Sequence, residues 1–252
     1  MRKTITAAVM LCAASLPLGA IAQDEDADQN YIYATYMYCD TTRQAAADEL
    51  FEKVQKPVLE DAKKKGTITG WGYLVHHTGG KWRRIRYHSA GSIEALLTGL
   101  EKIGEAMDAA GGDDDTFGQI CNSHDDYIWR SVAGSSGDRV SPTRGKVGLS
   151  AYHVCKMSQE DRADEIVEKV FAPIYNAHVG PGKLSSWGWS EHIVGGKYRR
   201  LSTMTADDWP TLLKMRGAIF EAIDEQDSAL GDQFSEICGS HSDYMWEIPH
   251  EG

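Results

Sequence analysis

The stretch that decides the fold is WGYLVHHTGGKWRR, Trp71–Arg84, because the chain writes it again as WGWSEHIVGGKYRR, Trp187–Arg200. The two stretches align without a gap at an offset of 116 residues. At the same offset, ADELFEKV at Ala47–Val54 aligns with ADEIVEKV at Ala163–Val170. The chain therefore carries two copies of one module, each about 100 residues long, which is a usual domain size.

The repeat also defines the limits of the copies. ICNSHDDYIW at Ile120–Trp129 aligns with ICGSHSDYMW at Ile237–Trp246, now at an offset of 117. We place the first copy at residues 31–132 and the second copy at residues 147–252. Residues 133–146, AGSSGDRVSPTRGK, are rich in turn-forming Gly, Ser and Pro and are predicted to be the linker.

Each copy shows the same order of predicted elements. Strands are indicated by β-forming residues, helices by apolar residues three and four apart, and the hairpin by a Gly-Gly pair. Pro57 lies inside the first helical pattern, and Pro173 repeats it, so a kink or break is expected there. In the first copy the predicted elements are a strand at 31–39, a helix at 41–66, strands at 68–77 and 81–88, a helix at 93–110 and a strand at 125–132.

The order β-α-β-β-α-β is that of a ferredoxin-like unit, whose sheet carries helices on one face only. Two such units in one chain can cover each other's bare sheet faces. The whole resembles the dimeric α+β barrel superfamily, here with two copies fused in tandem. This resemblance implies an α+β fold with a barrel closed within one chain. It also implies a range of activities, because members include cofactor-free monooxygenases, haem-degrading enzymes, isomerases and proteins without known activity.

The first residues and the composition suggest an exported protein. Arg2 and Lys3 precede an apolar run, and Ala20-Ile21-Ala22 forms a small-x-small cleavage site, which together predict a signal peptide at 1–22. Residues 23–30 would then be an acidic leader, and we expect no transmembrane segment in the mature chain. The formal net charge of −11 argues against nucleic acid as a partner. We expect a periplasmic or extracellular location.

Four cysteines remain after the predicted signal peptide, an even count that suggests disulfides in an exported chain. In the ferredoxin-like topology the first and last strands are antiparallel neighbours. The fold therefore predicts one bridge in each copy, Cys39–Cys121 and Cys155–Cys238. The cysteines are too far apart in sequence to suggest a metal site, and we predict none.

The hairpin of each copy offers candidate ligand-binding residues. If Gly79 and Gly80 form a two-residue turn, Val75 faces Arg84, and residues alternate between two faces. We expect positive φ at Gly80 and at Gly196 of the second copy. The more aromatic face is assigned to the barrel interior, and it would line a cavity that suits an anionic or planar ligand. Its key residues are Trp71, Arg84, Trp187 and Arg200. In the alternative interpretation, the tryptophans fill the core and the arginines pair with acids or reach water.

Histidines and tyrosines repeat as well. His76 and His192 could act as general bases or haem ligands, or could be structural residues near strand ends. Tyr127 and Tyr244 share a sheet face with the tryptophan two residues later and are assigned to the same ligand site. The SHDDY and SHSDY motifs each hold a His-x-Asp pair, which indicates either a dyad or a polar turn.

These observations favour an exported small-molecule-binding protein with a cavity between the two sheets. One alternative is a cofactor-free or haem-dependent monooxygenase or isomerase that uses the same cavity. Another is a structural or partner-binding module with a packed barrel. No cofactor is favoured, and haem is the alternative. The ligand and the question of catalysis stay open, because no P-loop, nucleophile elbow or HExxH motif is present.

Overall fold

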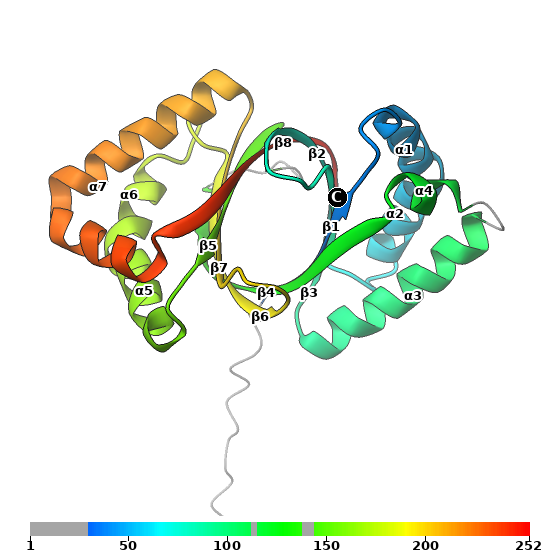
Figure 1. Cartoon of the computed structure of the whole chain (residues 1–252), viewed down its shortest axis with the longest axis horizontal. Helices are drawn as coiled ribbons and strands as arrows, with labels where there is room; N and C mark the ends of the chain where they lie inside the picture. The colour runs from blue at the N-terminus through cyan, green and yellow to red at the C-terminus, as the bar shows by residue number, and fades with distance from the viewer. Residues whose placement is uncertain (1–29, 112–114, 138–143) are drawn as a thin grey trace, which may run out of the picture.

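Eight antiparallel strands close into a single barrel in the computed structural model, which describes residues 30–111, 115–137 and 144–252 (Figure 1). The order around the barrel is β1-β3-β2-β8-β5-β7-β6-β4. The chain therefore has an α+β fold whose barrel closes without a second subunit. The strands of the first copy are β1 (Tyr31–Tyr38), β2 (Gly70–Gly79), β3 (Arg84–Ala90) and β4 (Ser123–Ser135), and those of the second are β5 (Val147–Val154), β6 (Ser186–Val194), β7 (Arg200–Ala206) and β8 (Ser240–Glu251).

The two copies join along two seams, where β2 pairs with β8 and β4 pairs with β6. Four antiparallel steps separate β1 from β5, so these two strands run in the same direction. Corresponding residues of the two copies therefore lie at the same end of the barrel. This arrangement gives the barrel two chemically distinct ends, one formed by the starts of β1 and β5 and the other by their ends.

A π-helical turn interrupts the first helical region of each copy at the predicted kink. In the first copy the turn lies between α1 (Gln44–Leu50) and α2 (Lys56–Lys64), and the Lys56 N–H donates to the Phe51 carbonyl five residues earlier. Pro57 has no N–H to continue the α-helical pattern, so the helix changes register instead of ending. The second copy repeats this with α5 (Glu160–Ile166), a π turn at Val167–Phe171 and α6 (Ala172–Ala177).

The helices of each copy cover the outer surface of its own half of the barrel (Figure 1). The first copy adds α3 (Ile93–Gly111) and α4 (Thr116–Ile120), and the second adds the single long helix α7 (Trp209–Cys238). A side chain of the barrel wall therefore points either into the lumen or under the helices. Across the described parts of the chain, no helix is long and apolar enough to cross a membrane.

Both predicted disulfides are confirmed. Cys39 pairs with Cys121 and Cys155 pairs with Cys238, at sequence separations of 82 and 83 residues. β1 pairs with β4, and β5 pairs with β8, as the predicted topology required. Each bridge therefore joins the end of the first strand to the segment that leads into the last strand of the same copy.

The hairpin has the predicted register, with Val75 opposite Arg84, but the prediction of its strained glycines is wrong. Positive φ occurs at Gly79 (128°) and Gly195 (149°), not at Gly80 or Gly196. The reason lies in the seam, because β2 continues to Gly79, which pairs with Tyr244 of β8. A Cβ on Gly79 would approach the Asp243 carbonyl oxygen to 2.6 Å, so the neighbouring strand requires glycine at this position.

Candidate functional site

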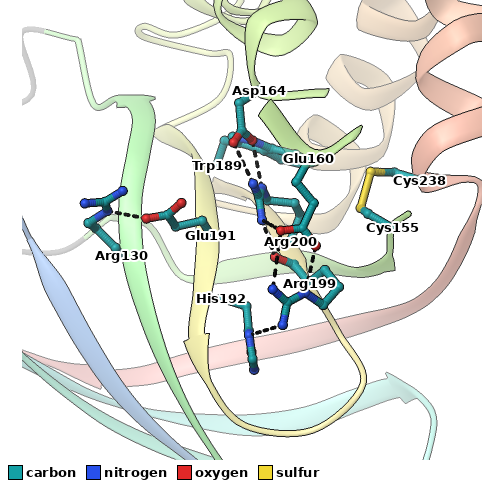
Figure 2. Close-up of polar contacts among 10 residues, drawn as sticks. All are labelled: Arg130, Cys155, Glu160, Asp164, Trp189, Glu191, His192, Arg199, Arg200 and Cys238. Carbon is teal, nitrogen blue, oxygen red and sulfur yellow. Dashed lines mark hydrogen bonds and ion pairs between the residues drawn. A yellow bond between two sulfur atoms is a disulfide. The ribbon is translucent and has the colours of Figure 1, made fainter. Parts of the chain in front are cut away.

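Arg84 and Arg200 lie on the outer face of the barrel, under the first helices of their copies. Arg84 donates to the two carboxylate oxygens of Asp48 at 2.6 and 2.7 Å. Arg200 donates to those of Asp164 at 2.8 and 2.6 Å and also contacts Glu160 at 3.1 Å (Figure 2). Both arginines are buried, and neither borders the cavities described below. The assignment of this hairpin face to the barrel interior is therefore wrong.

The faces are reversed because the aromatic side chains find their partners in the helices. Tyr73 donates its hydroxyl hydrogen to Asp48 at 2.8 Å and stacks on Phe51 at 3.8 Å between ring centroids. In the second copy, Trp189 Nε1 donates to Asp164 at 2.7 Å (Figure 2). The opposite hairpin face carries small and aliphatic residues, which fit the narrow interior of an eight-stranded barrel. The acid shared by ADELFEKV and ADEIVEKV thus explains the second arginine of the Arg-Arg ending in both hairpins.

His76 and His192 lie at the seams between the copies, and each is held by an arginine of its own hairpin. Arg83 Nη1 lies 2.9 Å from His76 Nδ1, and Arg199 Nη1 lies 2.6 Å from His192 Nδ1 (Figure 2). Burial, followed by the charge of these arginines, lowers the pKa of both imidazoles. Both histidines are therefore neutral at neutral pH, and neither borders a cavity.

Haem, the alternative cofactor, does not fit these two histidines. An axial imidazole must present a free nitrogen to a space that accepts the porphyrin. Both ring nitrogens of His76 lie near Arg83, and the ring packs edge-on against Trp246 at 5.9 Å between ring centroids. His192 Nε2 has no partner among the described residues, but it is buried, and the ring packs against Trp129 at 6.0 Å. In the described ranges, no group of three or more His, Cys, Asp or Glu residues is placed to hold a metal ion.

Tyr127 and Tyr244 belong to an aromatic layer that fills one end of the barrel. Tyr127 stacks on Trp129 at 5.0 Å between ring centroids, and Tyr244 stacks on Trp246 at 5.2 Å. The layer contacts itself across the copies, where Tyr36 meets Tyr152 at 5.4 Å. It also contains Trp82 and Tyr198. The two predicted tyrosines therefore help to close this end and do not border either cavity.

The His-x-Asp pairs lie at the starts of β4 and β8, near the disulfides. His124 Nδ1 is 2.8 Å from Asp126 Oδ2, and His241 Nε2 is 3.5 Å from Asp243 Oδ1. Both histidines are exposed. Only the second pair borders a cavity, so equal motifs have unequal surroundings in the two copies.

A cavity of about 640 Å³, here called the lumen cavity, occupies the barrel end opposite the aromatic layer. Tyr36, Trp129, Tyr152 and Trp246 form its floor. Trp71 and Trp187, two of the predicted site residues, border it as well, although their rings pack against the helices. Its walls are the inward-facing aliphatic and hydroxyl side chains of both copies.

A second pocket of about 400 Å³, here called the α7 pocket, lies outside the barrel wall between α7 and the strands β5, β6 and β7. Its body is aromatic and aliphatic, and a few polar groups converge on it, as in many sites for small organic molecules. The aromatic residues are Phe171, Tyr175, Trp187, Trp189, Phe220 and Phe234, and the polar ones are His153, Ser202, Arg216, Asp224, Asp232, Ser235, His241 and Asp243.

The α7 pocket exists because the second copy has a serine where the first has an arginine. Arg86 of β3 extends under the helices and donates to Gln55 at 2.8 Å and contacts Met107 Sδ at 3.2 Å. The aligned residue of β7 is Ser202, whose side chain ends near the sheet and lines the pocket. The space that a guanidinium fills in one copy is therefore open in the other.

His153 is the most deeply buried polar side chain of the α7 pocket. Burial lowers its pKa to about 4, so the imidazole is neutral at neutral pH. Its Nδ1 lies 3.3 Å from the Cys238 carbonyl oxygen, which can only accept a hydrogen bond. The hydrogen therefore sits on Nδ1, and Nε2 is an acceptor, at 3.2 Å from the Ser202 hydroxyl.

Arg216 supplies the pocket with a positive charge that is incompletely paired. Its Nη2 is 3.7 Å from Asp243 Oδ2, and its guanidinium lies over the Phe220 ring at 4.5 Å. Its Nε is buried and has no hydrogen-bond partner among the described residues. A buried N–H without a partner is costly, and an oxygen atom of a ligand would satisfy it.

Sequence reasoning missed the α7 pocket because it searched for residues present in both copies. His153, Ser202 and Arg216 align with Met37, Arg86 and Leu100, so none of them repeats. The sequence signal for this pocket is a difference between the copies: a large side chain in one copy is replaced by a small one at the aligned position of the other. Arg86 against Ser202 is such a position, and it lies two residues beyond the repeated phrase.

Comparison with known proteins supports the fold. No protein-family profile matches the sequence. No curated protein matches it either. Among solved structures, an anthrone oxidase-like protein covers 89% of this chain and 92% of its own, with 14% identity and a TM-score of 0.56. A protein from Fusobacterium nucleatum described as a putative monooxygenase covers 88% and 93%, with 10% identity and a TM-score of 0.60.

A chlorite dismutase variant from Candidatus Nitrospira defluvii is also similar. It covers 88% of this chain and 91% of its own, with 7% identity and a TM-score of 0.53. These neighbours are dimeric α+β barrel proteins, in agreement with the resemblance seen in the sequence. At such low identity the similarity establishes the shared fold and does not transfer a reaction.

Proposed function

We propose that this protein binds a planar aromatic molecule with an acidic oxygen in the α7 pocket and oxidises it with O₂. The observation that carries the proposal is the pocket itself, which is walled by aromatic rings and contains an unpartnered N–H of Arg216. The names of two structural neighbours, a monooxygenase and an anthrone oxidase-like protein, support the reaction class. This is the enzymatic alternative in its cofactor-free form, but in the α7 pocket and not in the cavity between the sheets, where that alternative was expected.

Arg216 and His153 have parts in the proposed chemistry. The guanidinium of Arg216 holds the oxygen of the substrate as it becomes negative, because a charged donor binds an oxyanion more strongly than a neutral one. His153 Nε2, an acceptor beside Ser202, takes the proton that the substrate loses. The aromatic walls exclude water and orient the flat substrate.

The proposed reaction is balanced with O₂ as the only co-reactant. A methylene carbon between two aromatic rings loses a proton to His153, and its electrons delocalise onto the oxygen held by Arg216. O₂ then forms a bond to this carbon. Cleavage of the O–O bond leaves one oxygen as a new carbonyl, and the other leaves as water with the two hydrogens of the methylene.

Oxygen uptake with 1,8-dihydroxyanthrone, measured with an electrode above the rate of its autoxidation, tests this function. The wild-type protein should consume one O₂ per molecule of quinone formed. Arg216→Gln and His153→Met should each lower the rate at least tenfold, while Arg86→Gln, at the aligned position of the first copy, should retain it. No uptake by the wild-type protein above autoxidation would refute the proposed oxidation.

Binding without turnover is the second candidate function, and the lumen cavity favours it. At about 640 Å³ this cavity is within the size range of sites for small molecules. It lies between the two halves of the barrel, which is where the sequence analysis expected a ligand. Mass spectrometry of molecules extracted from the purified protein would separate this function from a packed structural barrel, which should release nothing.

We also propose that residues 1–22 are a signal peptide followed by an acidic leader at 23–30, and that the protein is exported. Both segments lie outside the described residues. Two disulfides support the proposal, because such bonds persist in oxidising compartments. The mass of the mature chain from the native host should correspond to a start at Gln23. A mature chain that retains Met1, found with cytosolic proteins, would contradict export.

We further propose that the barrel consists of two ferredoxin-like units, residues 31–132 and 147–252, fused through 133–146. The repeated order of strands and helices supports this division, although β4 continues to Ser135 and so includes the first three residues of the predicted linker. Chain cleavage at Gly137 should leave two fragments that stay associated, because β2 pairs with β8 and β4 with β6. Fragments that separate as soluble folded monomers in gel filtration would contradict it.

A further inference from the structure

The two copies differ in chemistry at three aligned positions of the lumen-cavity wall. The first copy presents Ile32, Ala34 and Leu74, which are aliphatic. The aligned residues of the second copy are Gly148, Ser150 and Ser190, which are small or carry a hydroxyl group. Both copies add further aliphatic and hydroxyl side chains, such as Ser89 of the first and Leu201 of the second, so the mixed lining suits a molecule that is itself amphipathic.

One cross-strand pair explains why the lumen cavity is more open on the side of the second copy. In the first copy Gly72 faces Tyr87, and a Cβ on this glycine would overlap the tyrosine ring, so the ring lies across Gly72. In the second copy Gly188 faces Thr203, whose side chain is much shorter. The glycine is retained while the ring that would cover it is absent, and the vacated volume belongs to the lumen cavity.

The floor of the cavity contains a hydrogen-bond donor without a partner. Trp129 Nε1 donates to the Tyr36 hydroxyl at 3.0 Å. Its counterpart Trp246 is fully buried, and its Nε1 has no partner among the described residues. Since an unpaired buried N–H is unfavourable, this indole group marks a place where an acceptor atom of a ligand would be stabilised.

The charges that border the lumen cavity cancel each other. Arg144 and Glu251 are the only charged side chains among its described lining residues. Arg144 donates to Glu251 Oε1 through Nε at 2.8 Å and Nη2 at 2.6 Å, and the Tyr87 hydroxyl donates to the same oxygen at 2.6 Å. A charged ligand would find no free counter-ion here, whereas an uncharged one loses little on entry.

We infer that the lumen cavity is a second binding site, which takes an uncharged amphipathic molecule with an acceptor oxygen at the Trp246 indole. The site is separate from the α7 pocket, since the barrel wall lies between them and only four of the described wall residues border both. It does not depend on oxidation in the α7 pocket. The inferred ligand is a neutral molecule with an apolar body and at least one acceptor oxygen.

Nile red, a neutral planar dye with one carbonyl oxygen, is a suitable probe for this site. Its fluorescence titration should show saturable binding to the full-length protein, and 8-anilinonaphthalene-1-sulfonate, which is anionic, should bind at least tenfold more weakly. Thr203→Tyr, which restores the ring of the first copy, should abolish Nile red binding. Ser202→Arg, which fills the α7 pocket, should leave it unchanged.

The indole group has its own matched pair of variants. Trp246→Phe should weaken Nile red binding about fivefold to tenfold, whereas Trp129→Phe should not, because its N–H already has a protein partner. Circular dichroism should show that all four variants are folded. The inference fails if Nile red binding survives Thr203→Tyr or is lost in Ser202→Arg, and the second result would place the dye in the α7 pocket. Equal effects of the two tryptophan variants would overturn the role of the Trp246 indole.

Discussion

The two copies of the repeat form similar halves of the barrel, but they differ in the cavities that border them. Both use a disulfide of nearly equal span, a π turn before a proline, and a buried Arg–Asp pair that joins hairpin to helix. In the first copy, Arg86 fills the space between the sheet and the helices, and the Tyr87 ring fills part of the barrel lumen. The second has Ser202 and Thr203 at these positions and borders two cavities. Residues that repeat thus account for the barrel, while adjacent residues that fail to repeat account for the sites.

The two disulfides should contribute equally to the free energy of unfolding. They are expected to give the largest effect of the variants compared here. Loops of 82 and 83 residues predict about 4 kcal/mol of stabilisation for each bridge. Cys39→Ser/Cys121→Ser and Cys155→Ser/Cys238→Ser should therefore lower the free energy of unfolding by similar amounts in urea titrations. If one pair carried nearly all of the stabilisation, the two halves would not be equivalent in folding.

The buried ion pairs of Arg84 and Arg200 should contribute unequally to the stability of the two copies. Arg200 faces both Asp164 and Glu160, whose side chains are 16% and 12% exposed, whereas Arg84 faces Asp48, which is 34% exposed. Arg200→Met should lower the unfolding free energy by about 3 kcal/mol, because it removes the guanidinium from two largely buried carboxylates and leaves Asp164 with Trp189 and Glu160 with Arg199. Arg84→Met should cost about 2 kcal/mol. Equal losses in denaturant titrations would contradict the difference in burial.

At two aligned positions one copy has a histidine where the other has a methionine. These buried histidines predict that the stability of the protein depends on pH. Burial lowers the pKa of His88 and of His153 to about 4. The aligned residues are Met204 and Met37. Between pH 6.5 and 4 only the unfolded chain protonates these histidines, so stability present above pH 6.5 is lost as the pH falls. The loss should be about 2 to 3 kcal/mol per histidine.

His88→Met and His153→Met should each reduce this loss, because each gives one copy the residue of the other. The measurement is the urea midpoint at pH 7 and at pH 4.5 for the wild type and both variants. A wild-type midpoint that is independent of pH in this range would show that neither histidine is buried in its neutral form.

The hairpin glycines should give the smallest effects, and equal ones. Gly79 and Gly195 have positive φ, and a Cβ there would crowd β8 or the ring of Tyr127. Gly79→Ala and Gly195→Ala should each cost about 1 to 2 kcal/mol in thermal unfolding. Gly66→Ala is a useful comparison, because Gly66 also has positive φ but has open space around it. A larger loss for Gly66→Ala than for Gly79→Ala would refute the crowding at the seam.

The sequence was sufficient for the topology but not for the location of the sites. The hairpin register and the cysteine pairing are local or pairwise properties, and both predictions are confirmed. Which hairpin face points inward depends on the helices, where Asp48 and Asp164 bind the arginines that we had assigned to the interior. The α7 pocket depends on Ser202, which stands in the second copy where the first has Arg86. A search for motifs that repeat cannot detect a residue that differs between the copies.

The central claim is that the exchange of Arg86 for Ser202 creates a ligand site in the second copy alone. Calorimetric titration with anthracene-9-carboxylate, a planar aromatic anion that the uncharged lumen cavity should reject, tests it most directly. The account predicts one molecule bound per chain for the wild type and for Thr203→Tyr, and none for Ser202→Arg. Wild-type stoichiometry in a folded Ser202→Arg variant would contradict it.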